Sequence, residues 1–87
     1  MKKVYILVEN YTYDFDKELN LNVYDSKKKA AEQFEAAVER ERRDTWIATK
    51  SNVKQHYNKS ALSYNAYVDG CAAEFETEIY VKVEVVK

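Results

Sequence analysis

Few residues of this chain have side chains that act as nucleophiles or redox centres. Cys71 is the only cysteine and His56 the only histidine, so thiol catalysis would require these two to meet in space. One cysteine excludes an intramolecular disulfide and a Cys-x-x-Cys redox pair, and no metal site is expected. The neighbouring carboxylates Asp14, Asp16 and Glu18 suit acid–base chemistry, but a polar hairpin tip usually carries such groups for solubility. We therefore expect no enzymatic activity and no cofactor.

Tyrosine and glutamate are the residue types here that best suit a binding surface. Tyrosine occurs eight times and combines apolar area with a hydroxyl group at low entropic cost. Glutamates follow the last predicted strand at about 6.8 Å per two residues, close to the phosphate spacing of one nucleic-acid strand. The simpler interpretation is strand propensity for the tyrosines and a solvated face for the glutamates. The interface candidates are Tyr5, Tyr24, Tyr67, Tyr80, Glu74, Glu76 and Glu78.

The hydrophobic pattern predicts the elements that hold these residues. Residues 3–9 have apolar side chains on both faces, as in a central strand, and residues 19–24 alternate as its returning partner. Ser26 is a suitable N-cap for a helix that begins at Lys27. The apolar stripe of this helix consists of Ala30, Ala31, Phe34, Ala37 and Val38. Alternation then places Tyr5, Tyr24, Tyr67 and Tyr80 on the face opposite the aliphatic core.

The same hydrophobic periodicities predict the elements of the second half of the chain. Trp46, Val53 and Tyr57 fit a helical stripe, which predicts a second, shorter helix over residues 53–60, and Trp46 is expected to pack into the core. Residues 62–68 alternate as a strand, a turn follows at Asp69 and Gly70, and residues 75–86 form a long strand. The prediction is a single α+β domain over residues 1–87, with a four-stranded antiparallel sheet in the order ββαββ and the helices on one face.

The same plan predicts which strands lie at the edges of the sheet. The first and last strands have the most apolar residues on both faces and therefore belong in its centre. Residues 62–69 and 19–24 are then edges, and the chain has no proline to protect them. We expect a homodimer through the first of these edges, at Tyr64 and Ala66.

Composition excludes several classes of function. The net charge of -1 favours neither a protein that coats nucleic acid nor an acidic DNA mimic, so no sequence-specific DNA binding is expected. A single glycine excludes the phosphate-binding loops that need several. The apolar run near the start is far shorter than the ~20 residues that span a bilayer, which indicates a cytoplasmic protein without membrane contact.

The first 40 residues resemble a family of small phage and mobile-element proteins. The resemblance is carried by the opening Lys-Val-Tyr-Ile-Leu-Val-Glu of residues 3–9 and by Ser-Lys-Lys-Lys-Ala at residues 26–30. Val8 stands where the pattern usually has threonine, and Lys28 where it usually has glutamate. Some proteins of similar size in this group act as anti-CRISPR or other counter-defence factors, so the resemblance implies a host-directed binding protein.

These observations lead to three hypotheses of function. The first is a non-enzymatic inhibitor that binds a host effector protein, one that handles nucleic acid, through the tyrosine and glutamate face. The second is a sponge for a small signalling nucleotide, held by tyrosine stacking and by Arg40, Arg42 or Arg43. The third is an interaction module with no inhibitory role. A catalytic domain would instead require a cleft with perturbed ionisable groups.

Overall fold

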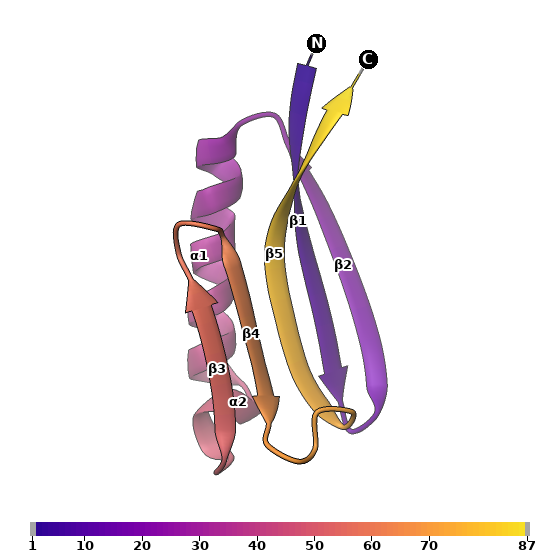
Figure 1. The fold of residues 1–87 in the computed structure, drawn as a ribbon, viewed down its shortest axis with the longest axis vertical. Coiled ribbons are helices and arrows are strands. Elements are labelled where there is room, and N and C mark those ends of the chain that lie inside the picture. Colours follow the sequence, from indigo (N-terminus) through magenta and orange to yellow (C-terminus); the bar gives the residue numbers. More distant parts are fainter. Residues whose placement is uncertain (1, 87) are drawn as a thin grey trace.

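A computed structural model describes residues 2–86 and has a five-stranded antiparallel sheet with two helices on one side (Figure 1). Across the sheet the strands follow the order β2-β1-β5-β4-β3. Neighbouring strands pair antiparallel throughout. The elements are β1 (Lys2–Tyr13), β2 (Asp16–Tyr24), α1 (Lys27–Asp44), α2 (Trp46–Thr49), β3 (Val53–Asn58), β4 (Ser63–Val68) and β5 (Phe75–Val86).

Local sequence explains where β1, β2 and α1 begin and end. Asp14 and Phe15 form the two-residue turn between β1 and β2, and both have positive φ angles, 51° and 71°, as a type I′ hairpin turn requires. The strands then pair without interruption from Tyr13 with Asp16 to Tyr5 with Tyr24. As predicted, the Ser26 hydroxyl caps α1 by accepting a hydrogen bond from a backbone N–H of its first turn, that of Lys29, at 3.3 Å.

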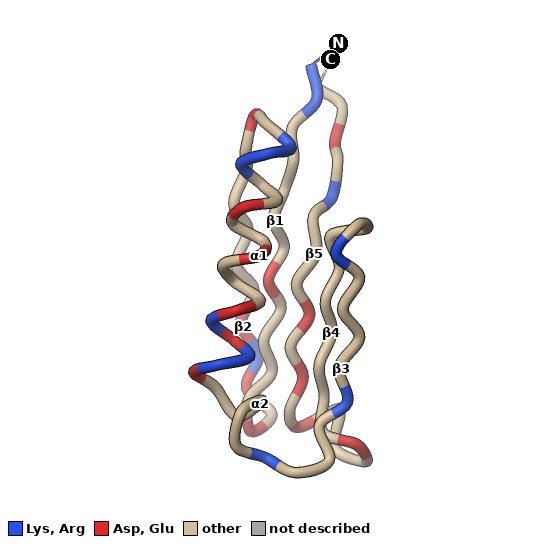
Figure 2. Tube along the Cα trace, turned by 90° about the vertical axis from the view of Figure 1, so that its left-hand side faces the viewer, with Lys and Arg blue, Asp and Glu red and all other residues tan. Residues whose placement is uncertain are grey.

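The core lies between α1 and one face of the sheet. Phe34 of α1, Tyr64 of β4 and Ile79 of β5 are each at most 1% exposed. Trp46 and Ile47 of α2 close the lower end of this layer, which confirms the prediction that Trp46 packs in the core. Seen from the side, α1 forms a separate layer against the sheet, with its lysines near its start and its arginines among acidic residues near its end (Figure 2).

The predicted α+β class and the helices on one face are confirmed, but the four-stranded sheet is wrong because there are five strands. Residues 53–58 form β3 instead of a second helix, and the second helix is the four-residue α2. Every residue of β3 except Val53 is exposed, and the strand lacks the apolar alternation that would reveal it.

The prediction that residues 62–69 form a sheet edge is also wrong. β3 pairs with β4 from Val53 opposite Val68 to Asn58 opposite Ser63, so β3 is the edge on that side. Tyr64 and Ala66, at 1% and 0% exposure, point into the core under the helix and cannot form the predicted dimer contact. The placement of β1 and β5 inside the sheet is confirmed, as is the edge position of residues 19–24.

Candidate functional site: the open face of the sheet

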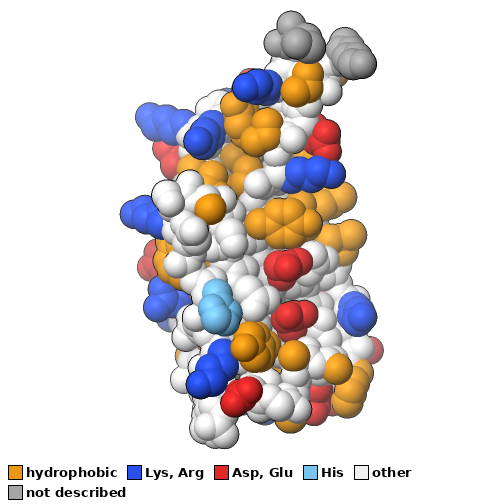
Figure 3. All heavy atoms as spheres, viewed as in Figure 1, with side chains coloured by type: hydrophobic (Ala, Val, Ile, Leu, Met, Phe, Trp, Pro, Cys, Tyr) orange, Lys and Arg blue, Asp and Glu red, His pale blue; other side chains and the backbone are white. Residues whose placement is uncertain are grey.

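One face of the sheet has no covering layer in the described part of the chain, because both helices pack on the other side. We call it the open face. Figure 3 views the molecule from this side and shows hydrophobic side chains over its upper part and a column of acidic side chains below them. The open face therefore has two chemically different parts.

The upper part is an apolar patch. The side chains of β2 that alternate onto this face are largely exposed, with Leu19 at 59%, Leu21 at 58% and Val23 at 63%. The strand register sets Val23 beside Ile6, and it sets Leu21 beside Val8, which in turn lies beside Tyr80. We define the apolar patch as Leu19, Leu21, Val23, Ile6, Val8 and Tyr80.

The lower part is an acidic row on β5. Glu76 and Glu78 alternate onto the open face, and each carboxylate is held by an asparagine of a neighbouring strand. Asn65 donates to Glu76 at 3.2 Å, and Asn10 donates to Glu78 at 3.1 Å. Such hydrogen bonds fix the carboxylates in position. They form a patterned negative surface beside the apolar patch, with Glu78 level with Leu19 across Asn10.

Aromatic rings continue the acidic row toward β3. Tyr67 of β4 lies opposite Glu76 in the register, and its ring stacks on that of His56 with centroids 6.1 Å apart and planes 21° apart. Glu74 precedes β5, in the connection from β4, and so does not continue the alternation. Of the interface candidates, the structure thus brings together Tyr67, Tyr80, Glu76 and Glu78.

Tyr5 and Tyr24 lie on the helix-covered face, and the prediction that they share the opposite face with Tyr67 and Tyr80 is wrong. They pair with each other across β1 and β2, in the same alternation as the core residue Leu7. β1 is apolar on both faces, so periodicity alone could not show which face the helix would cover.

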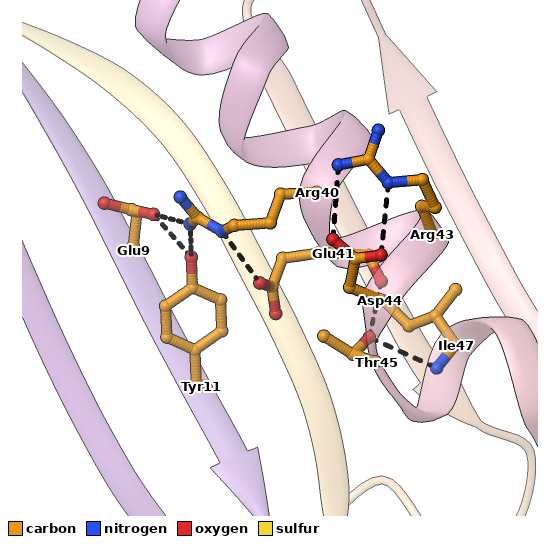
Figure 4. A network of polar contacts seen from close by, with 8 residues as sticks. All are labelled: Glu9, Tyr11, Arg40, Glu41, Arg43, Asp44, Thr45 and Ile47. Carbon is orange, nitrogen blue, oxygen red and sulfur yellow. Dashed lines mark hydrogen bonds and ion pairs between the residues drawn. The ribbon is translucent and has the colours of Figure 1, made fainter.

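The three arginines proposed as nucleotide ligands lie on α1, on the far side of the sheet from Tyr67 and Tyr80. Arg40 bonds to Glu9 at 3.0 Å and to Glu41 at 3.4 Å (Figure 4). Arg43 pairs with Asp44 and Glu39, and Arg42 lies over the Tyr57 ring. Carboxylates beside Arg40 and Arg43 repel a phosphate, which argues against the nucleotide sponge.

The polar network around Arg40 is a feature that sequence analysis missed. Glu9 is 7% exposed on the core side of β1, and its carboxylate accepts hydrogen bonds from Arg40 and from the Tyr11 hydroxyl. Burial, reinforced by Glu9, raises the pKa of Tyr11, and burial raises the pKa of Glu41 above 4.5 although Arg40 opposes it. A glutamate between Leu7 and Tyr11 on an inner strand face was the signal available in the sequence.

This network borders a cleft of about 810 Å³ between the β1–β2 hairpin and the end of α1. The cleft has perturbed ionisable groups, but Glu9 and Glu41 are already engaged by Arg40, so the cluster satisfies its own charges. The thiol–imidazole pair is not assembled: His56 lies opposite Asn65 within the sheet, while Cys71 is exposed in the turn beyond β4. Residues 2–86 contain no group of three side chains suited to hold a metal ion.

Comparison with known proteins adds no assignment. No family of known proteins, no curated protein and no solved structure matches this chain. In residues 2–86 no helix has the length and apolar character needed to cross a membrane. The case for function therefore rests on the surfaces of the molecule.

Proposed function

We propose that this protein is a non-enzymatic inhibitor that binds a nucleic-acid-handling protein through the open face of its sheet. The observation that supports this most is the apolar patch beside a fixed acidic row on a face that no described segment covers. The apolar half supplies affinity, and the acidic half selects the partner.

The apolar patch includes three exposed aliphatic side chains in a row. Leu19, Leu21 and Val23 are adjacent on one strand and are each more than half exposed. Scattered exposed apolar residues are ordinary on protein surfaces, but contiguous ones typically mark a binding site. Covering such a patch contributes about 25 cal/mol per Å² of apolar surface removed from water, which favours a protein partner with an apolar surface of its own.

The acidic row favours a partner surface that is also basic. Glu76 and Glu78 stand two residues apart on one strand, which separates them by about 6.8 Å, near the phosphate repeat of a single nucleic-acid strand. Grooves that bind single-stranded nucleic acid combine lysine and arginine with aromatic stacking platforms. A face with carboxylates, Tyr67 and an apolar patch is complementary to that combination.

The biological setting we propose follows from the resemblance of the first 40 residues to small phage and mobile-element proteins. In this setting the protein acts in the cytoplasm of the host cell on a defence effector, in the manner of an anti-CRISPR protein. Inhibition then requires no chemistry by this chain, because occupying the groove prevents the nucleic acid from binding.

The experiment that tests this proposal is capture of the partner by open-face variants. The double variant Tyr80→Ser, Glu76→Lys changes both halves of the face, and both residues are only partly buried, so the fold is expected to tolerate it. The matched control is Glu32→Lys with Gln33→Ser, which makes the same charge change at exposed positions of α1. The proposal predicts that the double variant loses an identified partner while the control retains it.

Competition tests the inhibitory part separately. Nucleic acid added to the complex should displace the captured protein if both occupy one groove. A partner that binds this protein and nucleic acid together would refute inhibition and leave an interaction module. Equal capture by the double variant and wild type would refute the open face as the binding surface.

A further inference from the structure

We infer that two copies of this chain pair through the exposed edges of β2, in an antiparallel arrangement about a two-fold axis at Leu21, and form one continuous sheet. β2 is an outermost strand of nine residues that pairs with β1 in an unbroken register, so its free edge is long and regular. Edges of this kind usually carry proline, a bulge or inward charge as protection. β2 lacks these devices between Leu19 and Tyr24.

The hairpin turn determines which backbone groups of β2 are free. A two-residue turn makes its flanking residues, Tyr13 and Asp16, a hydrogen-bonded pair, and such pairs alternate along an antiparallel ladder. The even-numbered residues of β2 therefore bond to β1. The N–H and C=O groups of the odd-numbered residues, among them Leu19, Leu21 and Val23, point outward and can bond to another strand.

One register satisfies these groups and also matches side chains. With Leu21 of one copy opposite Leu21 of the other, Leu19 lies opposite Val23 of the second copy, on the same open face. Lys17 then lies opposite Asp25 of the second copy, and symmetry repeats that pair at the other end. Aliphatic and opposite-charge pairs across strands each stabilise a sheet.

Charge at the two ends of the strand supports the same arrangement. The hairpin tip carries three exposed carboxylates, Asp14, Asp16 and Glu18, with one lysine, whereas the start of α1 carries Lys27, Lys28 and Lys29 after Asp25. Antiparallel pairing sets the acidic tip of one copy beside the lysines of the other, and Asp16 comes opposite Ser26 at the start of the helix. Asp25 pairs with Lys29 of its own copy at 3.5 Å. Lys27 and Lys28 are unfavourable at the positive end of a helix dipole, and the acidic tip of the second copy offsets that cost.

The other edge of the sheet is a poorer site for a second copy. β3 has six residues, and its residues Lys54 and His56 alternate onto the open face where β2 has leucines. Lysine on an edge strand is one of the devices that prevent strand addition. The lysine of β2, Lys17, stands at the hairpin end and outside residues 19–24, whereas Lys54 is the second residue of the shorter β3. This contrast favours β2 and provides a control position at Lys54.

The arrangement is independent of the partner proposed above. A two-fold axis perpendicular to the sheet leaves both open faces on one side, so the two apolar patches merge across the new strand pair. Tyr80 and Glu76 remain uncovered, and their substitution does not change the pairing. Failure of partner capture and failure of dimer formation are therefore distinguishable.

Site-specific crosslinking tests the register. In a Cys71→Ser background, Leu21→Cys should crosslink to itself with a thiol–thiol reagent of about 5 Å span, because a hydrogen-bonded antiparallel pair separates Cα atoms by about 5.5 Å. Leu19→Cys should not crosslink to itself, because the register separates the two copies of residue 19 by roughly 14 Å. Crosslinking at Leu19 instead of Leu21 would refute this register.

Sedimentation analysis at sub-millimolar concentration tests the assembly itself. We expect a dimer. Leu21→Pro removes an outward N–H and should raise the dissociation constant of the dimer at least about tenfold, whereas Leu21→Thr should raise it much less. Lys17→Asp should weaken the dimer, Lys17→Asp with Asp25→Lys should restore it, and Lys54→Asp should leave it intact. A monomer under these conditions would overturn the inference, and so would a dimer that Tyr80→Ser dissociates, since that would indicate stacked open faces.

Discussion

Replacing a leucine of the apolar patch should cost little stability, whereas shortening an isoleucine of the core should cost much. Leu21 is 58% exposed, so folding covers only about two fifths of its side chain. Full burial of a leucine contributes about 1.5–3 kcal/mol, which makes the share for Leu21 about 0.6–1.3 kcal/mol. Threonine keeps one methyl group and a high strand propensity, so Leu21→Thr should cost below about 1 kcal/mol.

Ile79→Ala is the contrasting substitution. Ile79 is 0% exposed and lies in the core between β5 and α1. Truncation of a buried isoleucine to alanine costs about 2–5 kcal/mol, because it removes buried methyl groups and leaves a cavity. A domain of this size has about 4–13 kcal/mol of stability, so Ile79→Ala removes a large share of it.

Urea unfolding followed by Trp46 fluorescence measures both variants. Trp46 is only 9% exposed in the folded protein, and its emission should change on unfolding. With a slope near 1 kcal/mol per molar urea, Leu21→Thr shifts the midpoint by less than about 1 M and Ile79→Ala by about 2 M or more. The protein is kept dilute, so that a β2 dimer makes no contribution. A loss of about 2 kcal/mol or more for Leu21→Thr would refute the open face as an uncovered surface.

Three further predictions concern the ionisable groups and the turn after β4. Burial raises the pKa of Glu41 above 4.5, so ionisation of this carboxyl group disfavours the folded state. Glu41→Gln should therefore raise Tm at neutral pH. Thermal melts should show that this gain vanishes below about pH 4, where the wild-type carboxyl group is also neutral. Burial raises the pKa of Tyr64 from 10.0 to about 12, so stability should fall as pH rises from 10 through 12, and Tyr64→Phe should flatten the fall in urea titrations; an unchanged slope would contradict this. Gly70 has a φ of 84° and nothing within 4 Å of an added Cβ, so Gly70→Ala should cost about 1 kcal/mol from backbone strain alone, with Gly70→Asn costing less in the same unfolding assay.

The strands with strong apolar alternation were predictable from sequence, and the weak one was not. β5 alternates over its whole length, and Ser26 with the stripe of α1 marked the helix, so both were placed correctly. β3 exposes nearly every side chain, and Val53 and Tyr57 are spaced by four residues, which fits a helix and a strand equally well. Residues 53–58 form a strand because they pair with β4. Such pairing is a tertiary contact, which the local sequence pattern does not contain.

The candidate site was predictable in its residue types and only partly in its geometry. Glu76, Glu78 and Tyr80 were expected on one face because a single strand carries them, and period-2 alternation is reliable within a strand. Tyr5 was assigned to the wrong face because β1 is apolar on both sides, and the sequence does not show which side receives α1. The Glu9–Arg40 pair joins residues 31 positions apart and depends on that choice as well.

Methyl NMR of the complex with the captured partner identifies the face that binds, because leucine, isoleucine and valine occur on both faces of the sheet. Binding through the open face should shift and broaden the methyl signals of Leu21 and Ile6, and those of Val81 and Val83, which alternate onto the helix-covered face, should stay in place. Large changes at Val81 and Val83 with unchanged signals from Leu21 and Ile6 would contradict the account.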